Sequence, residues 1–427
     1  MQSFSEKLIV EVSGRPLLVW GARMTGMGFL RFARRHRFEV LGFIDSDPSL
    51  CGRKVNGIPV YPPAEISVLR ASNPALKIVV AVALKEDEIV SSLREMGCDA
   101  SDWTLFTRYV ENYYTIDIVG TCNLKCLSCA YVMDYDNVKG VMLLDDFRQV
   151  LAKILGEVDI VSHVSLYSWG EPLLHPDLDV IIGLLHDAGI AVAVSSNLSF
   201  KNERPILKMV RAAPEYLKIS VSGFEPEVYD VTHSGGDIEL VKANLVKLRR
   251  WMDEFGTETF VDVNYHLYRN NNGTNLKNMG DFCRNLGFNF STSYALVMPL
   301  ERVLAYCDGN PDPKTLALHD LLLVGIDEGR EASKEFRNQP CRYLTNQVNI
   351  DWDRSVALCC VCFEKPNSII ADDYLTIGLE ELNARKLRHP MCAKCYFYGL
   401  PAYNLGFNQK EWQRIASLKP STDRHGG

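Results

Sequence analysis

The sequence predicts an α/β protein in several parts, and three observations lead to this prediction. A β-α-β pattern with a glycine-containing turn opens the chain, strand-like and helix-like runs alternate through its middle, and cysteine-rich sequence begins at Asn338. At 427 residues the chain is too long for one ordinary core. We expect a Rossmann-like domain at 1–108, a partial (β/α)6 TIM barrel at 109–298, a connector at 299–339, a compact metal-binding module at 340–418 and a tail at 419–427.

The composition is that of a folded protein without a nucleic-acid footprint. Charged residues make up 23% and hydrophobic residues 47%, and the formal net charge is -7. The longest apolar stretch, 78–84, is too short to span a bilayer, and the N-terminus lacks the basic and apolar regions of an export signal. We therefore expect a cytoplasmic protein that binds neither nucleic acid nor membrane. Its thirteen cysteines gather in clusters, which favours metal binding over disulfides.

The first hundred residues predict a small Rossmann-like unit. The turn at 21–28 resembles a dinucleotide-binding turn, but Arg23 stands where a second glycine would let the backbone approach a pyrophosphate. Asp45 and Asp47 can meet a ribose or simply form a polar turn. The segment 42–60 looks like the small domain that precedes the catalytic part of some sugar acyltransferases, which suggests sugar or nucleotide handling. The predicted strands are 16–21, 39–44 and 77–84, with helices through Phe32 and over 87–96.

The middle of the chain predicts a parallel sheet with right-handed crossovers. Six strand-like runs alternate with helical runs such as 145–155 and 240–255. Six units form a partial barrel, and chemistry in such folds gathers at the carboxyl ends of the strands. The predicted strands are 114–119, 162–168, 190–195, 217–222, 259–266 and 289–295.

Three cysteines after the first barrel strand, Cys122, Cys126 and Cys129, indicate an iron-sulfur cluster. Three thiolates can hold three irons of a four-iron cluster and leave the fourth iron open to a substrate. A zinc site would prefer paired C-x-x-C arms and a fourth protein ligand, which this run lacks nearby. Three unrelated buried thiols would not be expected in a polar segment that follows an apolar strand.

This cysteine run, followed after the next strand by Gly170-Glu171-Pro172, resembles the radical SAM superfamily over roughly half of the chain. The resemblance implies that the three cysteines ligate a 4Fe–4S cluster whose open iron chelates S-adenosylmethionine. Ser128 stands where the family often has an aromatic residue that packs on adenine, so this sequence leaves the adenine contact undefined. The implied cofactor-binding residues are Gly170, Glu171, Pro172, Ser195, Asn197, Ser220 and Ser222.

Four residues near predicted strand ends are candidates for the catalytic pocket, without assigned roles. They are Tyr167, Tyr265, His266 and Tyr268. For His266 an ordinary place on a half-buried strand is the favoured explanation.

A second cysteine set, Cys341, Cys359, Cys392 and Cys395, resembles the shortened auxiliary-cluster module called twitch and, more loosely, the longer SPASM module. Four thiolates can enclose a 4Fe–4S cluster completely, so we expect one auxiliary cluster. Cys360 and Cys362 compete with Cys359 as the second ligand. A structural zinc site closed by four cysteines is the alternative.

The resemblance implies a radical SAM oxidoreductase that cleaves S-adenosylmethionine to a 5′-deoxyadenosyl radical and abstracts hydrogen from a substrate carbon. We expect a carbohydrate-like small molecule as substrate: a sugar, an aminocyclitol or a sugar nucleotide. The auxiliary cluster would accept the electron, and a donor such as flavodoxin or ferredoxin would supply reducing power. The alternatives are a peptide-modifying maturase, which crosslinks or epimerises a peptide, and a non-enzymatic zinc-binding scaffold.

Overall fold

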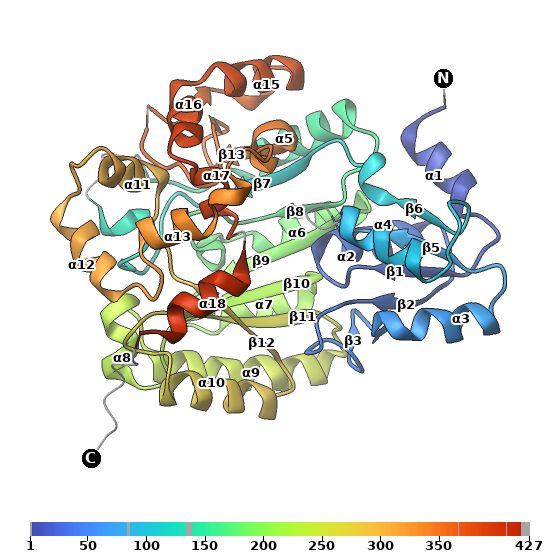
Figure 1. Ribbon diagram of the computed structural model, residues 1–427, viewed down its shortest axis with the longest axis horizontal. Helices are drawn as coiled ribbons and strands as arrows, with labels where there is room; N and C mark the ends of the chain where they lie inside the picture. Colours follow the sequence, from blue (N-terminus) through green and yellow to red (C-terminus); the bar gives the residue numbers. More distant parts are fainter. Residues whose placement is uncertain (1, 83–85, 134–138, 366, 407, 420–427) are drawn as a thin grey trace.

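The computed structural model describes residues 2–82, 86–133, 139–365, 367–406 and 408–419 (Figure 1). Two sheets organise the chain, one of six strands near the N-terminus and one of nine strands in the remainder. Among the described residues, no helix combines the length and the apolar character needed to cross a membrane.

The N-terminal sheet has the strand order β3-β4-β2-β1-β5-β6 and is parallel except where β3 meets β4. Apolar residues of α1 and α2 pack on one face, and those of α3 and α4 pack on the other, which confirms the predicted Rossmann-like layering. Its elements are α1 (Phe4–Val12), β1 (Leu17–Trp20), α2 (Met24–Arg35), β2 (Val40–Ile44), β3 (Lys54–Val55), β4 (Ile58–Tyr61), α3 (Ile66–Ser72), β5 (Lys77–Val80), α4 (Glu86–Glu95) and β6 (Trp103–Leu105).

The third strand of this domain is shorter than predicted. It ends at Val80, and Leu84, the predicted end, lies outside the described residues.

The second sheet contains all six predicted barrel strands in parallel, in the order β12-β11-β10-β9-β8-β7. Helices follow the strands and cover the outer face, as the alternation predicted. The elements are β7 (Tyr113–Asp117), α5 (Leu144–Glu157), β8 (His163–Ser165), α6 (Leu178–Asp187), β9 (Ala191–Ser196), α7 (Arg204–Ala212), β10 (Tyr216–Val221), α8 (Pro226–Thr232), α9 (Ile238–Phe255), β11 (Phe260–Leu267), α10 (Thr274–Asn285) and β12 (Asn289–Tyr294).

The strand predicted over 162–168 is only three residues long. Its continuation leaves the ladder because the backbone N–H groups of Ser168, Trp169 and Gly170 donate to the carboxylate of Asp117 instead of to a neighbouring strand. The segment therefore ends as a loop held by one side chain.

The C-terminal residues extend the barrel sheet, an arrangement that the sequence did not predict. β13 pairs in parallel with β7, and β14 and β15 continue antiparallel beyond it. Of the predicted tail only Lys419 is described. The elements are α11 (Leu300–Cys307), α12 (Pro313–Leu321), α13 (Ile326–Ala332), α14 (Arg342–Asn346), β13 (Gln347–Asp351), β14 (Val356–Ala357), β15 (Ile369–Ala371), α15 (Leu379–Arg388), α16 (Pro390–Phe397), α17 (Leu400–Asn404) and α18 (Gln409–Ser417).

Candidate active site and cysteine clusters

The inner face of the barrel sheet is polar. Side chains alternate along each strand, so neighbouring strands bring every second residue to the same face. Lys218 on β10 lies in register between Ser195 on β9 and Asp262 on β11. The inward residues of these strands and of β12 are Ser195, Tyr216, Lys218, Ser220, Asp262, Asn264, His266, Asn289, Ser291 and Ser293.

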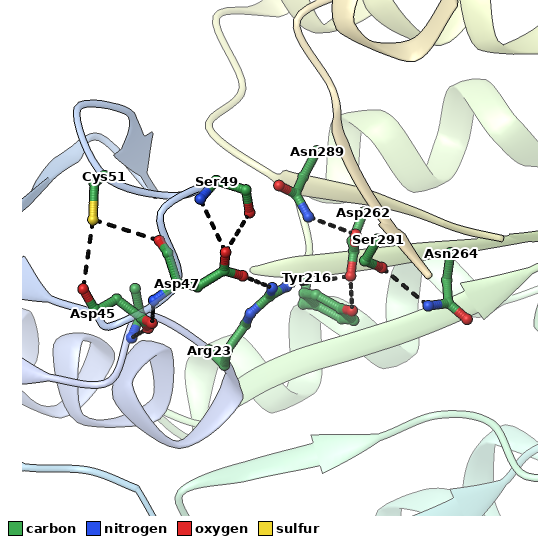
Figure 2. Close-up of polar contacts among 11 residues, drawn as sticks. Arg23, Asp45, Asp47, Ser49, Cys51, Tyr216, Asp262, Asn264, Asn289 and Ser291 are labelled. Carbon is green, nitrogen blue, oxygen red and sulfur yellow. Dashed lines mark hydrogen bonds and ion pairs between the residues drawn. The ribbon is translucent and has the colours of Figure 1, made fainter. Parts of the chain in front are cut away.

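Hydrogen bonds fix several of these side chains (Figure 2). The carboxylate of Asp262 accepts from the Tyr216 hydroxyl at 2.8 Å and from Nδ2 of Asn289 at 2.7 Å. Nδ2 of Asn264 donates to the Ser291 hydroxyl at 3.0 Å, and the Ser293 hydroxyl donates to Oδ1 of Asn264 at 2.9 Å. These bonds orient the polar side chains along the strands. Without them, the same groups would need water as a hydrogen-bond partner.

Lys218 is a functional candidate that the sequence analysis missed. Burial lowers the pKa of its ammonium group, while the charge of Asp262 opposes that change. Burial also lowers the pKa of His266, and the charge of Lys218 lowers it further. The signal was available, because a lysine alternates with apolar residues in the run Tyr216–Val221.

The four predicted pocket residues do not share one environment. His266 lies on the inner face of β11. Tyr167 is close enough to Asp262 to interact with its charge, and burial together with that charge raises the pKa of Tyr167. Tyr265 has the opposite parity to His266 on β11, and its hydroxyl donates to the carbonyl of Asn271 at 2.9 Å. Tyr268 is fully buried just beyond the end of that strand.

The three cysteines after β7 lie in a loop that is anchored through its backbone. The N–H of Lys125 donates to the carbonyl of Ser234, and the N–H of Leu127 donates to the carbonyl of Thr232, each at 3.0 Å. Burial raises the pKa of Cys122 to about 12, and Cys129 raises it too. Burial, Cys129 and Cys122 raise the pKa of Cys126, so the three thiols lie close enough to interact.

The Gly170-Glu171-Pro172 loop lies beside these cysteines. A Cβ on Gly170 would come within 1.6 Å of the carbonyl oxygen of Val119, so only glycine fits there. The N–H of Glu171 donates to the carbonyl of Thr121 at 2.9 Å. The two carboxylate oxygens of Glu171 accept from the backbone of Leu173 and of Asn197. The loop and the end of β9 are thus joined through one buried carboxylate.

The predicted cofactor-contacting residues beyond this loop lie in three different places. Nδ2 of Asn197 donates to Oδ1 of Asn123 at 2.8 Å and lies 3.7 Å from Sγ of Cys122, which places this side chain at the cysteine loop. Ser195 and Ser220 are on the inner face of the sheet. The hydroxyl of Ser222 is fully buried and bonds to Nδ1 of His233 at 2.5 Å and to the Thr232 hydroxyl.

The second cysteine set comes together in space from three separate segments. Cys341 precedes α14, Cys359 follows β14, and Cys392 and Cys395 lie on α16. These four and Cys362 line one small cavity.

Of the three competing residues, Cys359 and Cys362 line this cavity. Sγ of Cys362 also lies 3.5 Å from Sδ of Met391. The assignment of Cys359 as the fourth ligand stays a prediction.

Both sets offer the thiol donors that a four-iron cluster needs. Within the described part of the chain, no three His, Cys, Asp or Glu side chains converge as ligands of one metal ion. A four-iron cluster binds each thiolate through a different iron, so its ligands surround a volume and need not meet at one point. The thiols of both sets are partly buried, and those of the second set line one small cavity.

Together, the parallel partial barrel and the cysteine loop at the carboxyl end of its first strand define an enzyme of the radical, cluster-dependent class. Residues 116–261 match the radical SAM superfamily, so the chain contains a radical SAM domain. Members of that superfamily use a 4Fe–4S cluster and S-adenosylmethionine, so this protein is a radical SAM enzyme.

The chain is similar to several known proteins over part of its length. It is 24% identical over 247 residues to a probable GTP 3′,8-cyclase of Methanococcus maripaludis, covering 56% of this chain and 75% of the relative. It is 25% identical over 114 residues to an AdoMet-dependent heme synthase of Methanosarcina barkeri, covering 27% and 32%. The solved structure of Streptococcus suis SuiB with the precursor peptide SuiA aligns with a TM-score of 0.46 at 13% identity, over 72% of this chain and 69% of that one.

Proposed function

We propose that this radical SAM enzyme is an oxidoreductase for a small polyhydroxylated substrate: a sugar, an aminocyclitol or a sugar nucleotide. The observation that carries the proposal is the inner face of the barrel, where hydroxyl, amide, carboxylate and imidazole groups surround Lys218. Such a surface can form many hydrogen bonds to hydroxyl groups but offers little area for an apolar ligand.

Cys122, Cys126 and Cys129 would hold the first cluster, and Cys341, Cys359, Cys392 and Cys395 would hold an auxiliary one. When bound, the first cluster with S-adenosylmethionine supplies a 5′-deoxyadenosyl radical that removes a hydrogen atom from carbon, and the second supplies an electron acceptor. The backbone of Gly170, Glu171 and Pro172 would contact the cofactor, with Asn197 and the inward serines beside it.

The chain's own contribution to substrate oxidation is orientation and proton removal. Ser195, Ser220 and Asn264 would position hydroxyl groups of the substrate. Lys218 would accept the hydroxyl proton, because burial lowers its pKa and so favours the neutral amine. The oxidation then yields a carbonyl group, with one hydrogen atom, one proton and one electron leaving the substrate.

Replacement of a first-cluster cysteine tests the assignment of these ligands. The Cys126→Ala variant, reconstituted with iron and sulfide and then reduced, should form no 5′-deoxyadenosine from S-adenosylmethionine. Cys98→Ala is the matched control, because Cys98 is buried in the N-terminal domain, and it should retain formation. A Cys126→Ala protein that forms 5′-deoxyadenosine at the wild-type rate would falsify the assignment.

Two adjacent cysteines test the auxiliary cluster. Cys359→Ala should lower the iron content of anaerobically purified protein from about eight to about four atoms per chain, whereas Cys360→Ala should leave it unchanged. Iron, zinc and sulfide analysis provides the measurement. Equal iron loss in both variants, or zinc in place of iron, would contradict the proposed ligand set.

A further inference from the structure

A large cavity of about 810 Å³ lies between the N-terminal domain and the barrel. One wall is formed by the loops at the carboxyl ends of β1, β2 and β5, which is where α/β sheets of this kind bind ligands. The other wall includes Tyr113, His163 and Gln347, the first residues of β7, β8 and β13. The cavity thus lies at the amino end of the barrel strands.

This cavity borders the inner face of the barrel. Tyr113 and Asp117 have the same parity on β7, and Asp117 holds the Gly170 loop beside the cysteines. Asp117 is four positions after Tyr113, which corresponds to a rise of about 13 Å along the strand. A substrate that occupies both the cavity and the region of the first cysteine loop must be at least that long, so the cavity suits the non-reacting end of an extended molecule.

The charge of the cavity argues against a phosphate. Its described lining contains the carboxylates of Asp45, Asp47 and Glu88 but only one cationic side chain, Arg23. That guanidinium is already paired with Asp47 at 3.0 Å and with Asp262 at 3.3 Å, as Figure 2 shows. Among the described lining residues, an incoming phosphate would meet carboxylates and no unpaired cation.

The same groups suit an amine. Among the described residues, the carboxylate of Glu88 has no ion-pair partner, and the carboxylate of Asp45 accepts only from the backbone N–H groups of Ala22 and Asp47. Tyr113 and Tyr343 provide aromatic surface for the apolar face of a sugar ring, and Asn346 provides a polar amide group. Carboxylates beside aromatic rings are groups that recognise a protonated amino sugar.

We propose that this inter-domain cavity binds the amino-bearing, phosphate-free end of the substrate, an amino sugar or aminocyclitol ring. This inference rests on the proposed function and narrows it, because it disfavours a sugar nucleotide whose pyrophosphate would occupy the cavity. Arg23, which occupies the glycine position of a dinucleotide-binding turn, joins the two domains through Asp47 and Asp262.

Binding of simple ring probes to the full-length protein tests the inference. Glucosamine, glucose and glucose 1-phosphate are titrated into anaerobically purified protein by ligand-observed NMR, without S-adenosylmethionine or reductant. Glucosamine should bind about tenfold more tightly than glucose, and glucose 1-phosphate should bind more weakly than glucose. Tighter binding of glucose 1-phosphate than of glucosamine, or equal binding of all three probes, would overturn the inference.

A pair of variants on α4 locates the site. Glu88→Gln should weaken glucosamine binding about threefold and leave glucose binding unchanged, whereas Glu95→Gln, exposed on the same helix, should change neither. Unchanged glucosamine binding by Glu88→Gln would place the amine elsewhere and overturn the assignment. The 5′-deoxyadenosine assay on the same samples separates this failure from failure of the proposed function, because the cavity lies at the amino end of the barrel strands and the first cysteine loop follows the carboxyl end of β7.

Discussion

At the scale of single residues, Asp117 and Glu171 determine the shape of the candidate cofactor site. Each is almost completely buried, and each uses its carboxylate to accept backbone N–H groups of neighbouring loops. Burial raises the pKa of Asp117 and that of Glu171 to about 7 each. These two carboxyl groups therefore fix the loops at the ends of β8 and β9. Their burial and raised pKa values alone would have suggested catalytic acids.

Gly170 provides a sharp test of this packing. We expect Gly170→Ala to abolish formation of 5′-deoxyadenosine and to lower stability by roughly 1–3 kcal/mol, because the added methyl group would displace the backbone at Val119. Gly183→Ala is the control: nothing lies within 4 Å of its position on α6, and alanine favours a helix, so stability should rise slightly. Urea unfolding and the cleavage assay measure both effects, and wild-type cleavage by Gly170→Ala would contradict this packing.

At the scale of elements, helix α2 attaches the N-terminal domain to the barrel through Glu215. Its carboxylate accepts from Arg31 on α2, from Nε2 of His186 at 3.2 Å and from the N–H of Val192 at 2.7 Å. Burial raises the pKa of Glu215, but the hydrogen bond from His186 and the charge of Arg31 outweigh it, so the pKa is lowered overall. A carboxyl group with a lowered pKa stabilises the folded state only while it is ionised.

We predict that Glu215→Gln destabilises the protein by about 2–3 kcal/mol at neutral pH, because it leaves Arg31 without its charged partner. The wild-type advantage should be complete above about pH 4.5, the ordinary carboxyl pKa, and should disappear as the pH falls through the lower folded pKa. Urea unfolding of both proteins over this range measures the difference. Glu254→Gln, exposed on α9, should cost almost nothing, and a pH-independent difference for Glu215 would refute the linkage.

The elements that the sequence predicted well are those whose pattern is local. Alternating apolar residues and helical periodicity located all six barrel strands, because each strand is buried on its helix-covered face. The position of β13 depends on a partner more than two hundred residues earlier in the chain, and nothing in the run Gln347–Asp351 specifies β7. Long-range pairing of this kind is set by the three-dimensional fold and leaves no periodic signal.

The same distinction applies to the candidate site. The cysteine spacing and the Gly170-Glu171-Pro172 motif are contiguous in sequence, and the structure brings both together beside Asn197. The place of Lys218 between Ser195 and Asp262 depends on how three strands pair, so it emerged only from the assembled sheet. The choice of Cys359 over Cys360 and Cys362 came from the family resemblance and stays a prediction.

At the scale of the whole molecule, the C-terminal residues complete the barrel. Val348 and Ile350 on β13 are buried in the same core as Tyr114 and Ile116 on β7. The indole of Trp352 lies so close to Gly120 that a Cβ there would come within 2.1 Å of its Nε1. The auxiliary-cluster segment therefore supports the loop that leads into the first three cysteines.

Removal of that segment should consequently damage the first site as well as the second. We predict that a chain shortened after Gln339 exposes the edge of β7 and an apolar core face, so that it aggregates or forms no 5′-deoxyadenosine. A chain shortened after Lys419 retains every described element and should behave as the full-length protein does. Size-exclusion chromatography, circular dichroism and the cleavage assay distinguish the two chains. The chain ending at Gln339 could instead be monomeric and cleave S-adenosylmethionine at the wild-type rate. That result would show that β7 and the cysteine loop keep their structure without β13, and it would contradict the supporting role inferred for the C-terminal segment.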